Sequence, residues 1–246
     1  MGEPGARKVF LCRLNSGRPI LLSDDKSAHR AFATKLVEAT QCRVIVPNYR
    51  LTPQVITPET KFEHPGHAED ILAFLTFLPT WAELGGVSDK SVHLLGHSAG
   101  AHILASILLD SSAVTPSLMP SPIVTKMVHG VILSEGIYDI ELLLERFPSY
   151  RQWFIAAAFG ERDSYADVSV LKYPSRNQLE GLRWLIVHST GDTLVDIPQS
   201  QNMATHLTTL YGDSNVEAVF NVFSVEHDDV LLEPSFSSLV RKFLNQ

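Results

Sequence analysis

The chain has 246 residues, 45% of them hydrophobic, and its 20 lysines and arginines against 27 aspartates and glutamates give a net charge of −7. This length and hydrophobicity predict a single large α/β domain over residues 1–246. The negative balance, with no basic cluster, argues against nucleic acid or an anionic membrane as partner. A small-molecule substrate fits the composition better.

The two cysteines, Cys12 and Cys42, match neither a disulfide framework nor a C-x-x-C metal or redox site, so we expect a reducing compartment, the cytoplasm. Arg13 interrupts the first apolar run too early for a signal peptide. The longest apolar stretch, 71–78, is far shorter than the roughly 20 residues that span a bilayer. We expect no cofactor and no metal, and a monomer or homodimer.

Short apolar runs alternate with helical patterns along the chain. In the first half, strands are predicted at 8–12, 42–46 and 91–95, and helices at 25–40, 67–78 and 101–109. The buried face of the first helix is expected to hold Ala28, Phe32, Leu36 and Val37. Prolines at 53, 58 and 65 make the stretch 51–66 a predicted loop.

In the second half, a linker rich in proline and serine after Ser111 leads to predicted strands at 128–133, 184–188 and 216–223, with helices at 198–210 and 233–244. The stretch 137–159 is largely helical and rich in aromatic residues, and we expect a cap-like helical insertion over about 137–176. The alternation predicts a mostly parallel sheet of about six strands with helices on both faces. Reactive groups in such a sheet lie at the carboxyl ends of the strands.

The pentapeptide Gly96-His97-Ser98-Ala99-Gly100 falls where the strand at 91–95 turns into the helix at 101–109. A G-x-S-x-G sequence in this context is typical of a nucleophile elbow, a sharp turn that exposes the serine hydroxyl. The glycines lack the Cβ atoms that would collide where strand and helix converge. We therefore predict Ser98 as a nucleophile, with the backbone N–H of Ala99 as one oxyanion donor.

A serine nucleophile needs a base within hydrogen-bond reach and a carboxylate to orient that base. Asp192 follows the strand at 184–188 and His227 follows the strand at 216–223, which gives the order Ser, Asp, His. The roles predicted are attack by Ser98, proton transfer by His227 and orientation of its ring by Asp192. Asp139 and, less strongly, Asp196 are rival acids, and nine other histidines compete with His227. His97 is expected to pack beside the site.

Several longer stretches resemble the α/β-hydrolase family and, within it, fungal-type kynurenine formamidases (arylformamidases). They are Tyr49-Arg50-Leu51-Thr52-Pro53, the elbow with Ala101-His102, Glu135 to Leu143 with Phe147-Pro148-Ser149-Tyr150, and His227-Asp228-Asp229-Val230. The resemblance implies hydrolysis of a linear amide, N-formyl-L-kynurenine, to L-kynurenine and formate in tryptophan catabolism. Aromatic residues at 138–159 fit an aryl substrate or ordinary packing equally well, and the substrate contacts expected are Tyr49, Tyr138, Trp153 and Phe154.

The sequence departs from the family near its beginning. Family members carry His-Gly-Gly after an early strand, whose N–H groups complete the oxyanion hole, and usually have further strands upstream. This chain has no His-Gly-Gly, so its family-type amino-terminal strands are predicted to be missing. The second oxyanion donor is then Asn15, Ser16 or Gly17, or the chain is a truncated or alternatively spliced form. Because losing one donor costs about 10²–10³ in rate, we expect low activity.

Two other functions stay open from the sequence. One is a generalist carboxylesterase on the same fold, and the other is a catalytically impaired hydrolase-fold protein that binds a ligand or partner.

Overall fold

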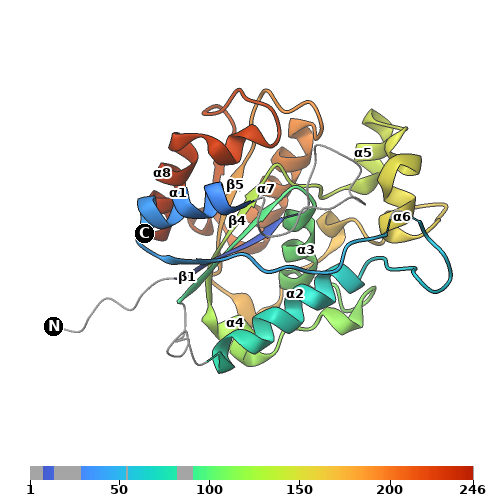
Figure 1. The fold of residues 1–246 in the computed structure, drawn as a ribbon, viewed down its shortest axis with the longest axis horizontal. Coiled ribbons are helices and arrows are strands. Elements are labelled where there is room, and N and C mark those ends of the chain that lie inside the picture. Colours follow the sequence, from blue (N-terminus) through green and yellow to red (C-terminus); the bar gives the residue numbers. More distant parts are fainter. Residues whose placement is uncertain (1–7, 14–28, 54, 82–90, 246) are drawn as a thin grey trace.

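The computed structural model describes residues 8–13, 29–53, 55–81 and 91–245 (Figure 1). The described residues form a six-stranded parallel sheet in the order β2-β1-β3-β4-β5-β6, which confirms the predicted parallel α/β architecture. The strands are β1 Lys8–Arg13, β2 Arg43–Ile45, β3 Val92–His97, β4 Val128–Ser134, β5 Arg183–Val187 and β6 Val216–Val219.

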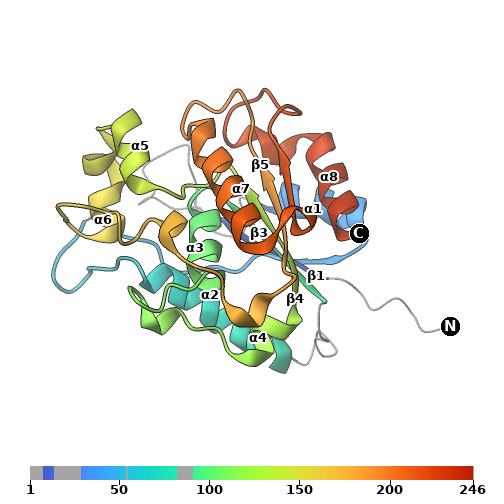
Figure 2. The same cartoon turned by 180° about the vertical axis from the view of Figure 1, so that it is seen from behind.

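Helices cover both faces of this sheet, as Figures 1 and 2 show from opposite sides. On one face lie α1 (Arg30–Thr40) and α8 (Pro234–Leu244), which pack on the sheet in one apolar cluster. On the other lie α2 (Gly66–Phe77), α3 (Ala99–Leu108), α4 (Pro122–Met127) and α7 (Ile197–Tyr211), packed in a second cluster.

Strand β5 shows why these strands are continuous apolar runs. Trp184 and Ile186 belong to the cluster beneath α7, whereas Leu185 and Val187 belong to the cluster beneath α1 and α8. Successive side chains of a strand point to opposite faces, so a strand covered on both faces must be apolar at every position. All four side chains are fully buried.

Two predictions about secondary-structure elements and one about a buried residue are wrong. The strand predicted at 216–223 ends at Val219, because the backbone carbonyl of Phe223 accepts a hydrogen bond from the N–H of Thr190 instead of extending the sheet. The linker after Ser111 contains helix α4, whose proline lies at the first helical turn, where it needs no backbone donor. On α1, Phe32 and Leu36 are buried but Val37 is 42% exposed. Ala28 lies outside the described residues.

A third apolar cluster lies beyond the carboxyl edge of the sheet. It includes residues of α5 (Ile140–Arg146), a π-helical turn (Arg151–Ile155) and the segment after α6 (Ala156–Phe159). Val195, from the loop after β5, packs into the same cluster and ties it to the strand ends. This part of the chain lies at the right of Figure 1.

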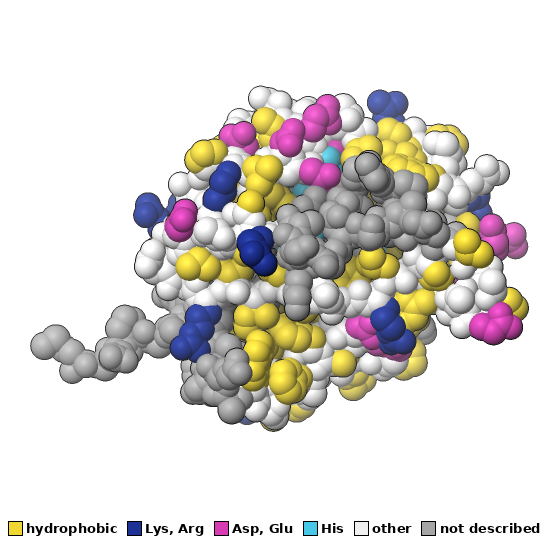
Figure 3. All heavy atoms as spheres, in the orientation of Figure 1, with side chains coloured by type: hydrophobic (Ala, Val, Ile, Leu, Met, Phe, Trp, Pro, Cys, Tyr) yellow, Lys and Arg dark blue, Asp and Glu magenta, His cyan; other side chains and the backbone are white. Residues whose placement is uncertain are grey.

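Within the described residues, no helix is long and apolar enough to cross a membrane. On the face shown in Figure 3, lysine and arginine side chains are scattered singly among acidic and hydrophobic ones.

Candidate active site

Three residues directly follow the last residues of neighbouring strands: Ser98 after β3, Glu135 after β4 and His188 after β5. The strand register pairs His97 with Ser134 and Ser134 with Val187. One step further, the N–H of Ser98 donates to Ser134 O at 2.8 Å and the N–H of Glu135 donates to Val187 O at 3.0 Å. The parallel register thus brings the three side chains to one edge of the sheet.

Ser98 occupies a strained turn between β3 and α3. Its φ of 55° and ψ of −125° are rare for a residue with a side chain, and such strain is maintained only where the surroundings determine it. A Cβ on Gly96 would lie 2.5 Å from the carbonyl oxygen of Gly100, so this close approach requires glycine. The N–H of Ala99 lies in the first turn of α3, where helix geometry leaves amide donors unpaired.

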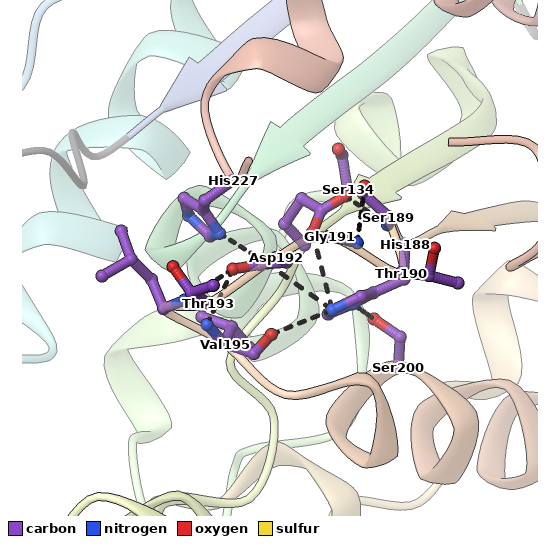
Figure 4. A network of polar contacts seen from close by, with 12 residues as sticks. Ser134, His188, Ser189, Thr190, Gly191, Asp192, Thr193, Val195, Ser200 and His227 are labelled. Atoms are coloured by element: carbon purple, nitrogen blue, oxygen red, sulfur yellow. Dashed lines mark hydrogen bonds and ion pairs between the residues drawn. The ribbon is translucent and has the colours of Figure 1, made fainter. Parts of the chain in front are cut away.

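Asp192 and His227 come together as the sequence order predicts. His227 Nδ1 lies 2.6 Å from Asp192 Oδ2, and both side chains are almost completely buried (Figure 4). Because a carboxylate can only accept, Nδ1 carries the proton, and the neutral ring keeps its lone pair on Nε2. Within the described part of the chain, that buried Nε2 has no hydrogen-bond partner. It is therefore the nitrogen able to accept a proton.

The local backbone keeps Asp192 ionised. Its other oxygen, Oδ1, accepts the N–H groups of Leu194 at 2.8 Å and Val195 at 2.9 Å. Burial by itself would raise the pKa of Asp192, but the hydrogen bond from His227 and these amides hold that pKa below its ordinary value. Histidine and aspartate side chains can also bind a metal ion together, but two ligands of one tetrahedral zinc lie about 3.3 Å apart. His227 Nδ1 and Asp192 Oδ2 are closer, at 2.6 Å, so we interpret this contact as a hydrogen bond.

The loops that carry Asp192 and His227 are bound to each other. Ser189 Oγ donates to Val225 O at 2.6 Å and accepts the N–H of Val225 at 2.9 Å. A Cβ on Gly191 would lie 2.6 Å from Ser224 O, so the two backbones meet at a distance that only glycine permits. These contacts fix the spacing of the acid and the base.

The rival acids have other roles. Asp139 Oδ1 accepts the N–H of Leu142 at 3.1 Å and caps the start of α5. Asp196 immediately precedes α7, and burial raises the pKa of its carboxyl group. Asp192 is the carboxylate that contacts His227.

His97 lies beside the predicted base, as expected. Its ring is fully buried, its centroid is 4.6 Å from that of His227, and its Nδ1 lies 3.2 Å from Ser134 Oγ. The contact restricts the orientation of the His227 ring.

Sequence reasoning missed two buried residues of this cluster, Glu135 and His188. His188 Nε2 donates to Val195 O at 3.0 Å, and its Nδ1 lies 2.7 Å from Ser200 Oγ; burial lowers the pKa of His188 and so favours the neutral ring. Glu135 is fully buried, and burial together with Asp192 raises its pKa well above the ordinary value for a glutamate. A carboxylate directly after an apolar strand, level with Ser98, was the signal available for Glu135.

A largely apolar cavity lies next to Ala99. Its walls come from α2 and the loop before it, from α3, and from the segments before and after α5: His64, His67, Ala99, His102, Ile103, Ile137, Phe154, Ala158 and Phe159. His102 Nδ1 lies 3.2 Å from Ile137 O and therefore donates to it, which leaves a lone pair on Nε2. Burial lowers the pKa of His67 and His102 to about 4. Burial also lowers the pKa of His64 well below its ordinary value.

Of the predicted substrate contacts, Phe154 lines this cavity. Tyr49 is not among the residues that line the cavity, but its ring centroid lies 6.5 Å from that of His67, which does line it. Trp153 packs on Tyr150 and Phe154, and Tyr138 is fully buried in the core beside Gly136. The candidates for the second oxyanion donor, Asn15, Ser16 and Gly17, lie outside the described residues.

A family model described as alpha/beta hydrolase fold matches residues 21–219. The chain belongs to this family. Solved structures with the same fold include an esterase from Pseudomonas putida (TM-score 0.64, 16% identity, 98% of this chain and 73% of that one) and a hyperthermophilic esterase from Pyrobaculum calidifontis (TM-score 0.66, 16% identity, 99% and 76%). At these identities, the likeness concerns the fold alone.

Curated relatives resemble the chain more closely in sequence. Kynurenine formamidase from Meyerozyma guilliermondii is 32% identical over 65% of this chain and 57% of the relative. Kynurenine formamidase from Drosophila melanogaster is 36% identical over 82% of this chain and 61% of the relative. That from Scheffersomyces stipitis is 25% identical over 82% of this chain and 77% of the relative. The chain thus spans less than two thirds of the length of the relatives from Meyerozyma guilliermondii and Drosophila melanogaster.

The elbow geometry predicts a specific effect of Gly96→Ala. Its methyl group must displace the Gly100 backbone, which destabilises the fold by about 1–3 kcal/mol and moves Ser98. We expect labelling of Ser98 by a fluorophosphonate to slow more than tenfold. Gly181→Ala is the control: its Cβ meets nothing within 4 Å, so it loses only about 1–2 kcal/mol to its positive φ. Equal labelling of both variants would contradict the role assigned to Gly96.

The buried histidine His102 predicts a loss of stability in acid. Its pKa is lowered from 6.5 to about 4 in the folded state, so the unfolded chain binds the proton first as pH falls. Between pH 7 and pH 5, this residue should remove about 2 kcal/mol from the free energy of unfolding. Urea titrations at both pH values should show a smaller loss in His102→Gln. An identical loss in wild type and variant would show that His102 does not make this contribution.

Proposed function

We propose that this α/β-hydrolase is a serine hydrolase that cleaves N-formyl-L-kynurenine to L-kynurenine and formate. The observation that carries the proposal is the buried pair of Asp192 and His227, joined at 2.6 Å, at the same sheet edge as the strained Ser98. The likeness to curated kynurenine formamidases supports the substrate.

In the first half of the proposed reaction, Ser98 Oγ attacks the carbonyl carbon of the formyl group. His227 Nε2 accepts the hydroxyl proton, and Asp192 stabilises the resulting imidazolium through Nδ1. The negative charge moves to the former carbonyl oxygen, next to the N–H of Ala99 at the start of α3. The C–N bond then breaks, and His227 returns the proton to the aryl amine that leaves as kynurenine.

In the second half, water hydrolyses the formyl ester on Ser98. His227 takes a proton from the water as its oxygen attacks, and returns that proton to Ser98 Oγ as the ester bond breaks. The products are formate and free enzyme. No redox step is involved, and the same base serves both halves.

The cavity beside Ala99 is the proposed substrate site. Its apolar side chains Ile103, Ile137, Phe154 and Phe159 suit an aromatic or small acyl group. The buried Nε2 atoms of His64 and His102 find no hydrogen-bond partner among the described residues, and a substrate could supply one. Three of these apolar side chains, Ile137, Phe154 and Phe159, belong to residues 137–176. We propose that residues 137–176 form a cap over the site.

A second candidate activity is the hydrolysis of small esters, because esterases share this fold. An ester differs in its leaving group, since an alcohol departs more readily than an amine. A comparison of N-formyl-L-kynurenine with p-nitrophenyl acetate separates the two: fast ester cleavage without deformylation would reject the formamidase proposal.

Variants of the three proposed catalytic residues provide the direct test. Ser98→Ala and His227→Ala should lower kcat for deformylation by on the order of 10⁴–10⁶, and Asp192→Asn by about 10⁴. Asp196→Asn is a matched control, because it removes a nearby carboxylate that does not contact His227; it should stay within about threefold of wild type. Deformylation by Ser98→Ala at the wild-type rate would refute the mechanism. No turnover by wild type, with normal labelling of Ser98, would instead favour an impaired hydrolase fold.

A further inference from the structure

Glu135 adopts a backbone conformation that a glutamate ordinarily avoids. Its φ is 51°, one of three positive values at non-glycine residues in the described part of the chain, and another of the three is Ser98. A glycine would adopt this φ without strain, but the glycine here, Gly136, stands one position later. A strained residue with a buried carboxyl side chain at a strand end points to a function for that side chain.

The carboxyl group of Glu135 has two unequal oxygens. Oε1 accepts the N–H of Ser189 at 2.8 Å. Oε2 is buried, and no described residue donates a hydrogen bond to it. His188 Nε2 lies 3.5 Å away, but its proton is directed to Val195 O at 3.0 Å. An ionised Glu135 would therefore leave a charged oxygen without a donor.

Asp192 lies directly against this group. The same His188 Nε2 is 3.5 Å from Glu135 Oε2 and 3.6 Å from Asp192 Oδ2, and Glu135, Asp192 and His227 contribute ligating atoms that all lie within 4.8 Å of one another. Two buried carboxyl groups in contact cannot both be ionised, since like charges repel strongly in a low dielectric. A proton on Glu135 Oε2 removes the repulsion between the two carboxyl groups and makes Oε2 a hydrogen-bond donor toward Asp192.

We propose that Glu135 is a protonated carboxylic acid that donates a hydrogen bond to Asp192 and acts as a positioning residue for the Asp192–His227 pair. The proposal rests on the proposed function insofar as that pair is catalytic. Asp192 would then be held by four donors: the amides of Leu194 and Val195, His227 Nδ1 and Glu135.

The surroundings favour this protonation state from every side. The other groups that face Glu135 are the carboxylates of Asp192 and Asp228, the phenol of Tyr138 and the imidazoles of His188 and His227. Burial lowers the pKa of His188 and raises that of Tyr138, so burial favours the neutral form of both side chains. The charges next to Glu135 are therefore negative, and they favour its neutral form.

The first experiment measures stability and needs no activity. Between pH 7 and pH 9 the folded state would hold the Glu135 proton, whereas the unfolded chain, with an ordinary glutamate pKa of 4.5, would not. The unfolding constant of wild type should therefore rise about tenfold per pH unit relative to that of Glu135→Gln, or about a hundredfold over the range. Urea titrations of both proteins give this ratio. A ratio that does not change with pH would overturn the proposal.

The second experiment separates positioning from backbone structure. Glu135→Gln keeps a neutral donor and should retain fluorophosphonate labelling of Ser98 and deformylation within about threefold of wild type. Glu135→Gly relieves the positive φ but removes the donor, and should lower both about ten- to a hundredfold, the range seen when supporting partners of metal ligands are lost. Wild-type activity in the glycine variant, or an equal loss in both, would contradict the role.

The two proposals can fail separately. If the stability ratio changes with pH as expected but no protein deformylates the substrate, the proposed function fails and the protonation of Glu135 stands. If deformylation requires Ser98 and His227 but the ratio is constant, the proposed function stands and Glu135 is ionised.

Discussion

A carboxylate that stays ionised out of water is the constraint on which the site depends. The Asp192 side chain is fully buried, and an isolated buried charge is so costly that the group would normally take up a proton. The structure compensates this cost with donors: two backbone amides on one oxygen and the His227 ring on the other. The ring is thereby held in the tautomer that leaves Nε2 free to accept a proton.

The sheet supplies the rest of the geometry. Because β3, β4 and β5 are parallel and in register, the residues that follow them reach the same edge. Two of these residues, Ser98 and Glu135, have positive φ values. Gly96 lies two positions before Ser98, and Gly136 directly follows Glu135. The buried cores on the two faces hold the strands rigid enough to maintain this strain.

Much of this arrangement could be predicted from the sequence. Buried parallel strands are continuous apolar runs, so the strands and their order along the chain were recognisable, and a G-x-S-x-G elbow located Ser98. Asp192 could be distinguished from Asp139 only by structure, because both follow strands. What differs is that Asp139 caps α5, whereas the loop of Asp192 is bound to the loop of His227 through Ser189.

The failures have physical reasons as well. The apolar run at 216–223 continues beyond β6 because Phe223 is buried beneath α8 without being in the sheet. Pro122 indicated a linker but begins a helix. Glu135 stands out as a carboxylate directly after an apolar strand, but its proposed role depends on a neighbour 57 positions away in the sequence, so the local pattern alone does not assign that role.

We propose that the formyl group passes through a covalent bond to Ser98, and a rapid-quench experiment can trap that bond. Wild-type protein mixed rapidly with N-formyl-L-kynurenine and quenched in acid should carry one formyl group on the peptide that contains Ser98, detected by mass spectrometry. Formate production without this adduct, under conditions that trap a formyl ester on a control serine hydrolase, would contradict the account.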